Sequence, residues 1–188
     1  MFLQDTGREP MKRYIWMIVA FALIGLVVYG CRSRTGNTDV IDGGVRHWED
    51  TNAPKVIQST KITSFFCKAS AVGMMEEDTP LAGNIFKLQA TEKEASYHRM
   101  VRGENEETFS FVPDEAFLDA LQEIVAKYDF AQQNGIYYSV SGIPEYFGSK
   151  IDIDYESGER ISASNNQHCF LSIEALEALN DLFLRYRQ

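Results

Sequence analysis

The strongest constraint on the fold is an alternating segment, KIDIDYESGERISAS, at residues 150–164. Apolar Ile151 and Ile153 alternate with Asp152 and Asp154, which is typical of a strand with one buried face and one face in water. After a short polar stretch the alternation resumes in the residues that follow Glu159. The segment therefore predicts a β-hairpin that lies over a hydrophobic core.

The buried face fixes the register of this hairpin. A two-residue turn would place apolar residues opposite polar ones, whereas a three-residue loop at residues 156–158 keeps the faces apart. Three-residue loops place a left-handed residue last, so we expect a positive φ at Gly158. The predicted pairs are Ile153 with Ile161, Ile151 with Ala163, and Asp154 with Arg160.

Other segments predict the remaining elements of a mixed domain. Strands are expected at residues 56–70, as a pair within 84–103 that turns at 91–94, and at 107–112 and 136–141, with loops at 73–83 and 142–148. A helix is expected from Pro113, ending between Tyr128 and Gly135, and a second helix is expected after Ser172, with Leu171 and Leu176 as a hydrophobic staple. The fold class predicted is α+β, an antiparallel sheet with two helices packed on one side.

The N-terminal residues have the layout of an export signal. Lys12 and Arg13 precede a 14-residue run without charge, residues 15–28. A helix of that length spans about 21 Å, which is short for a bilayer core of about 30 Å. Residues 1–10 fit a short cytoplasmic extension, or they precede a true start at Met11.

The end of this run resembles the lipobox of bacterial lipoproteins. Val28, Gly30 and Cys31 match the pattern, whereas Tyr29 replaces the small or aliphatic residue usual there. The resemblance implies that Cys31 receives a diacylglyceryl group, carrying fatty acids such as palmitate, and becomes the first residue after cleavage. It implies a lipid anchor at the extracytoplasmic face of the cell membrane, and a membrane-spanning helix that ends in cysteine is the alternative.

Three regions follow from these patterns. Residues 1–30 are expected to form the signal peptide, residues 31–54 the lipidated cysteine and a flexible tether rich in glycine and polar residues, and residues 55–188 a single α+β domain. The stretch at residues 139–166 also resembles small lipoproteins of Gram-positive gut bacteria. That resemblance agrees with a surface location and implies no activity.

Charge limits the partners of the domain. From Cys31 onward the chain has 15 Lys and Arg residues and 25 Asp and Glu residues, a balance of −10. Such a domain repels phosphate backbones, so we expect no nucleic acid partner. It also repels anionic headgroups, so contact with membrane lipid is expected only through the N-terminal anchor.

Few residues suggest chemistry. Cys67 and Cys169 could form a disulfide outside the cytoplasm, or they could be two buried thiols. His47, His98 and His168 lack metal-ligand spacing.

Acidic residues of the hairpin, Asp152 and Asp154 among them, could hold a cation or act as an acid/base pair, although a solvated strand face explains them. The sequence also contains an aromatic loop that could bind a peptide or sugar, although core packing also explains it. Its residues are Tyr137, Tyr138, Tyr146 and Phe147.

The sequence thus predicts no catalytic, cofactor-binding or metal site. Our first hypothesis is a lipid-anchored domain that binds or scaffolds an unidentified ligand or protein at the cell envelope. The alternatives are a single-pass membrane protein with the same domain and an envelope hydrolase without a recognisable motif. A pocket that holds a histidine or paired carboxylates with perturbed pKa values would favour the hydrolase.

Overall fold

The computed structural model describes residues 37–41, 44–72, 81–101, 106–143 and 147–187. The chain divides into two compact units, Met1–Thr35 and Gly36–Gln188. The signal and lipobox residues, Cys31 included, lie outside the described residues, as do most of the loop expected at 73–83 and the middle of the loop expected at 142–148.

Along the chain, the second unit has two runs of strands, and a helix follows each run. Its elements are β1 (Asn37–Ile41), β2 (Val45–Glu49), β3 (Ile62–Ser70), β4 (Asn84–Thr91), β5 (Ala95–Val101), β6 (Glu107–Phe111), α2 (Glu115–Lys127), the 3₁₀ helix η1 (Phe130–Gln133), β7 (Ile136–Val140), β8 (Ser149–Tyr155), β9 (Arg160–Asn165) and α3 (Ile173–Leu184).

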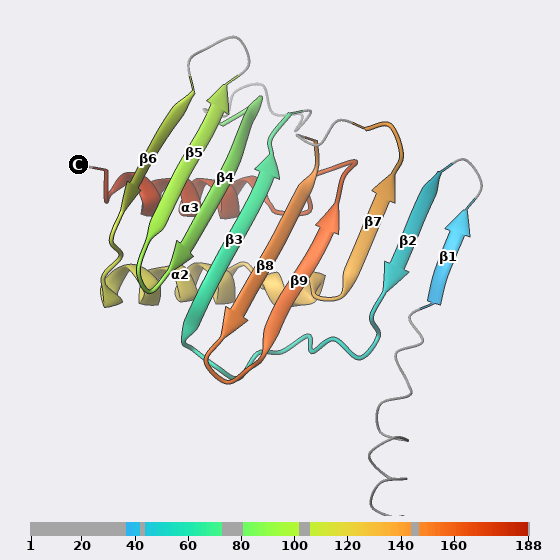
Figure 1. The fold of residues 1–188 in the computed structure, drawn as a ribbon, viewed down its shortest axis with the longest axis horizontal. Helices are drawn as coiled ribbons and strands as arrows, with labels where there is room; N and C mark the ends of the chain where they lie inside the picture. Colours follow the sequence, from blue (N-terminus) through green and yellow to red (C-terminus); the bar gives the residue numbers. More distant parts are fainter. Residues whose placement is uncertain (1–36, 42–43, 73–80, 102–105, 144–146, 188) are drawn as a thin grey trace, which may run out of the picture. The chain divides into compact units, whose positions relative to one another are not determined.

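Within the described residues the strands form one nine-stranded sheet in the order β1-β2-β7-β9-β8-β3-β4-β5-β6. Neighbouring strands are antiparallel, apart from β7 and β9, which run parallel. Helices α2 and α3 cross the same face of the sheet (Figure 1). The predicted α+β class, with two helices on one side, is confirmed; the parallel pair was not predicted.

The hairpin at residues 150–164 has the predicted register. Ile153 pairs with Ile161 and Ile151 with Ala163, and Asp154 faces Arg160. Gly158 has a φ of 85°, as expected for the last residue of a three-residue loop.

The strand expected from residue 56 begins only at Ile62. The preceding backbone is bound to the hairpin loop instead, because the Glu159 carboxylate accepts hydrogen bonds from the backbone N–H groups of Gln58 and Ser59, each at 2.9 Å. The predicted start of the strand at residue 56 was wrong, because hydrogen bonds to a side chain about a hundred positions away take the place of strand pairing.

The flexible tether predicted at residues 31–54 is also wrong over much of its length, because β1 and β2 belong to the sheet. Asn134 and Gly135 fix the following segment. The Asn134 side chain donates to the carbonyls of Pro54 and Arg160 at 2.9 and 2.8 Å, and Asp50 N–H donates to Gly135 at 2.8 Å. The backbones approach so closely that a Cβ on Gly135 would lie 2.7 Å from the Asp50 oxygen.

Side-chain caps set the start of both helices. The Ser172 hydroxyl accepts from Ala175 N–H, which confirms the predicted cap of α3. In α2 the cap is Asp114, whose carboxylate accepts from Phe117 N–H at 2.8 Å. Pro113 therefore precedes the cap and does not lie in the first turn, where the sequence pattern predicts it. Helix α2 ends at Lys127, one residue before the predicted range, with Tyr128 as its C-cap, and η1 follows.

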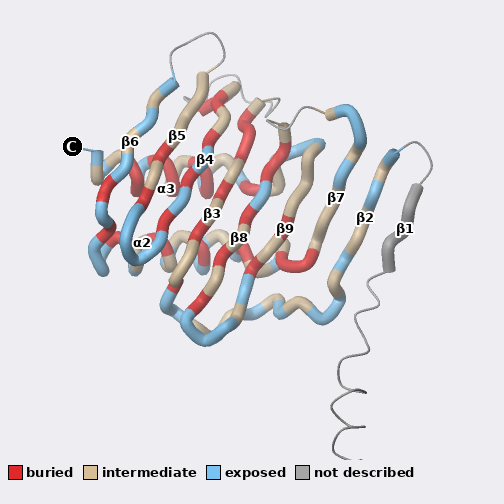
Figure 2. Tube along the Cα trace, viewed as in Figure 1, coloured by how far each residue is buried: buried red, intermediate tan, exposed pale blue. Residues whose placement is uncertain are grey.

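The core lies between the helices and the central strands. Figure 2 shows buried residues concentrated in β4, β3, β8 and β9 and fewer in β7 and β2. Aromatic rings join the sheet to α3, because the ring centroid of Phe183 lies 6.3 Å from that of Tyr97 and 6.0 Å from that of Phe111. One polar contact crosses this core: the Tyr97 hydroxyl donates to Asn180 Oδ1 at 2.7 Å.

This buried contact gives a test of how α3 is held on the sheet. Tyr97→Phe leaves the Asn180 oxygen without its donor, so we expect the free energy of unfolding to fall by about 1–3 kcal/mol. Urea unfolding of the purified chain measures the change. The double variant Tyr97→Phe/Asn180→Leu replaces both partners by apolar groups and should recover most of the loss. Equal destabilisation by the single and double variants would contradict this role.

Candidate functional site

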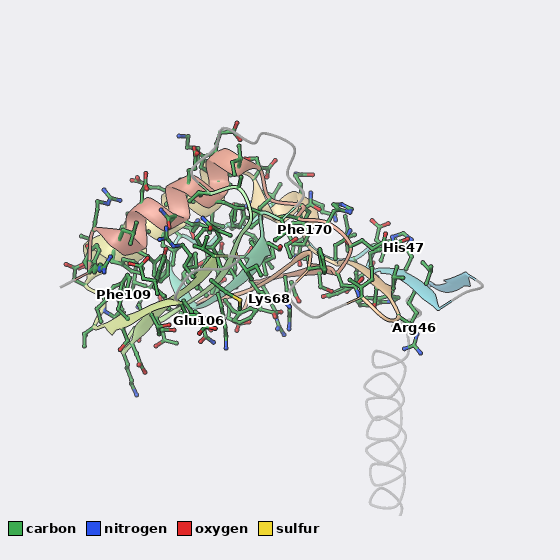
Figure 3. All side chains as sticks on the ribbon, turned by 90° about the horizontal axis from the view of Figure 1, so that it is seen from above. Arg46, His47, Lys68, Glu106, Phe109 and Phe170 are labelled. Carbon is green, nitrogen blue, oxygen red and sulfur yellow. The ribbon has the colours of Figure 1, made fainter. Side chains whose placement is uncertain are left out.

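The sheet has one face covered by helices and one open face. In β3, Cys67 is fully buried on the covered side, whereas its neighbours Phe66 and Lys68 are partly exposed on the open side. Figure 3 shows the same alternation in β2, where the labelled Arg46 and His47 point to opposite sides of the sheet. Neither α2 nor α3 covers the open face (Figure 1).

A pocket of about 290 Å³ opens at one end of this face, where β3, β7, β8 and β9 meet. That volume is near the lower end of the range for small-molecule sites. Two lysines, several hydroxyl and amide groups and two apolar side chains form its wall; the lining residues are Lys68, Tyr138, Ser139, Ile143, Phe147, Ser149, Lys150, Ser164, Asn165 and Asn166.

The pocket exists because β7 and β9 separate after only two paired residues. The Asn166 side chain then takes the place of a strand neighbour. Its Oδ1 accepts from Val140 N–H and its Nδ2 donates to the Val140 carbonyl, both at 2.8 Å. The Asn165 carboxamide oxygen accepts from the N–H groups of Gln167 and His168, which turns the chain away from β7. The divergence leaves space between the strand ends.

Close packing makes the pocket wall rigid. Gly148 has a φ of 71°, and a Cβ at this position would overlap the backbone oxygen of Asn165. Its own carbonyl accepts from Ser70 N–H at 2.9 Å. The next residue, Ser149, is buried, and its hydroxyl accepts from Phe170 N–H at 3.0 Å.

The lining contains two cationic groups and no carboxylate. Lys150 Nζ lies 2.9 Å from Asp152 Oδ2, and Asp152 also accepts from Ser162 Oγ at 2.6 Å and from Arg160 at 3.0 Å. Burial alone would raise the pKa of Asp152, but the hydrogen bonds from Ser162 and Lys150 hold the pKa below its ordinary value. Asp152 is therefore suited to an ion pair and not to donating a proton.

The other candidate residues from the sequence are not brought together. His98 is on β5, where its Nε2 lies 3.2 Å from a carboxylate oxygen of Glu106. His47 is on β2, and His168 follows β9 and contacts Asn165. Among the described residues, no group of three His, Cys, Asp or Glu side chains is placed to hold a metal ion.

The aromatic loop prediction has a mixed outcome. Tyr138 and Phe147 line the pocket, whereas Tyr137 stacks on Trp48 with ring centroids 4.6 Å apart. Tyr146 lies outside the described residues. The sequence reasoning missed Lys68, Lys150 and the two asparagines. The only local signal was the alternation around Lys68, which places it opposite the buried Cys67.

Both cysteines of the described domain are free thiols. Cys67 is fully buried, and burial raises the pKa of both thiols above the ordinary value. The alternative of two buried thiols from the sequence therefore fits Cys67, whereas Cys169 is only half-buried. Cys31 lies outside the described residues.

Comparison with family models, with curated proteins and with solved structures finds no match for this chain. Within the described ranges, neither helix has the length and apolar character needed to cross a bilayer.

Two glycines test the packing of the pocket wall. Gly148→Ala should destabilise the fold by more than about 3 kcal/mol, because the new methyl group overlaps fixed backbone. Gly158→Ala is the matched control: its φ is equally positive, but a Cβ added there would meet no atom within 4 Å. Its cost should be only about 1–2 kcal/mol. Denaturant midpoints of the two variants give the comparison, and similar losses would contradict the close approach at Gly148.

Proposed function

We propose that the protein is a lipid-anchored extracytoplasmic binding domain, which presents its open sheet face to a ligand at the cell envelope. The observation that carries the binding role is the pocket on the uncovered end of β3, β7, β8 and β9. Most of its lining residues are polar or cationic and three are aromatic or apolar, so the pocket is suited to a small polar ligand.

The anchor is supported by the sequence alone. The charged start, the short apolar run and the lipobox-like residues at 28–31 together favour export and acylation of Cys31. Two acyl chains on one residue hold a protein on a bilayer far longer than one chain. Membrane lipid is thus the first partner, and the ligand of the open face is the second.

The sequence limits how far the domain can extend from the proposed anchor. Residue 37 begins β1, so only five residues separate Cys31 from the first strand. An extended segment of that length reaches at most about 20 Å. The domain would therefore be held near the membrane surface, and its acidic balance would keep it from adhering to anionic headgroups.

Replacement of the lipobox cysteine tests the anchor. Cells that express the protein with radiolabelled palmitate should label the wild-type chain and the Cys67→Ala control, whereas Cys31→Ser should lose the label entirely. Intact mass should show a mature chain that begins at an acylated Cys31. Protease added to intact spheroplasts should digest the domain, because it faces outward.

An unlabelled wild-type chain that retains residues 15–28 and stays in the membrane would contradict lipidation. That result would favour the single-pass alternative. A domain that is protected from protease in intact spheroplasts would contradict the extracytoplasmic location.

A further inference from the structure

We infer that the open face binds a small molecule through a carboxylate or phosphate group, held by a row of lysines that crosses the sheet. This inference rests on the proposed binding function and names the ligand class at the same site. The observation behind it is the register of neighbouring strands, which aligns basic residues from β5, β4, β3 and β8.

Each residue of the row pairs directly with the next across the ladder. His98 faces Lys87, Lys87 faces Lys68, and Lys68 faces Lys150. Neighbouring strands lie about 4.8 Å apart, so the three lysines span roughly 10 Å of the sheet. Beyond Lys150 the row continues with polar and aromatic residues: Ser164, Tyr137 and Trp48.

Direct opposition of like charges is unfavourable in a sheet. Elsewhere this sheet places opposite charges across from each other, as in Arg99 with Glu107, whose charged atoms lie 3.0 Å apart. Acidic residues are plentiful in the domain, yet none faces Lys87 or Lys68 across a strand. The row therefore departs from the charge pairing of the rest of the surface.

Each end of the row lies against a carboxylate, whereas its middle does not. His98 lies against Glu106, and Lys150 against Asp152. In the described part of the chain, neither Lys68 nor Lys87 forms an ion pair. Two adjacent cations without a carboxylate are suited to an anion, which would replace the repulsion between them by attraction.

The pocket indicates the size and character of the rest of the ligand. Lys68 belongs both to the row and to the pocket lining. The lining also includes the polar side chain of Ser164 and the apolar side chains of Ile143 and Phe147. A ligand that fits this lining has one oxyanion at the lysines and a compact body that is partly apolar.

Titration of the full chain in non-ionic detergent tests the inference. The probes are inorganic phosphate, N-acetylalanine as a carboxylate, and N-acetylalaninamide as its neutral counterpart, each compared with sodium chloride at the same ionic strength. We expect phosphate or N-acetylalanine to raise the thermal midpoint in a saturable way. Comparison of the phosphate and N-acetylalanine titrations then shows which of the two anions the site binds more tightly.

Lysine variants locate the effect. Lys68→Met removes the charge and keeps the apolar stem, so we expect oxyanion affinity to fall about tenfold or more. Lys68→Arg should retain binding. Lys93→Met, in the exposed turn between β4 and β5, changes the net charge equally and should leave affinity unchanged. Without anion, Lys68→Met should also raise the urea midpoint, because it removes a like-charge contact.

The results separate this inference from the proposed function. Binding of the neutral amide as strongly as N-acetylalanine would overturn the anion specificity and leave a binding domain. Equal weakening by Lys68→Met and Lys93→Met would show a general charge effect and would overturn the site. No response to any probe would also overturn the inference, while palmitate labelling of Cys31 would still test the anchored location.

Discussion

The register of the three central strands β3, β8 and β9 is the constraint on which the rest of this structure depends. It places Cys67, Ile151 and Ala163 side by side beneath the helices. A shift of one residue in any of these strands would move its apolar set to the open face. The same register places Lys68 and Lys150 together on that open face, so the core and the candidate site are two consequences of one alignment.

The candidate site lies where regular pairing stops. β7 and β9 share two paired residues, and the Asn166 side chain then substitutes for a strand. Natural sheets tend to close such gaps, because unpaired backbone groups are unfavourable when buried. Here the backbone groups of Val140 are satisfied by an amide side chain and the gap stays open. The row of like charges beside the gap also lowers the stability of the fold, and the packing of the other described elements does not require it.

Local patterns were sufficient for the elements whose partners are near in sequence. The β8–β9 hairpin, the turn between β4 and β5 and the Ser172 cap each depend on residues within about fifteen positions. Two predictions that were wrong, the strand from residue 56 and the flexible tether, involve distant partners, whereas the misplacement of Pro113 is local. Residues 37–41 and 45–49 have the polar composition of a linker, and they form strands because β7 pairs with β2 and β2 pairs with β1. The lysine row could not be predicted because it needs the pairing of β3 with both β4 and β8, and alternation does not specify which strands are neighbours.

The most direct test of the central register is the reactivity of Cys67 toward iodoacetamide, measured by peptide mass mapping on the native chain under reducing conditions. The structure places this thiol on the covered face with no exposed surface, next to Lys68 on the open face. It predicts that Cys67 stays unmodified until denaturant unfolds the domain. Modification in the native state, at the rate of an exposed cysteine, would show that β3 has the opposite face toward the helices and would contradict both the core and the lysine row.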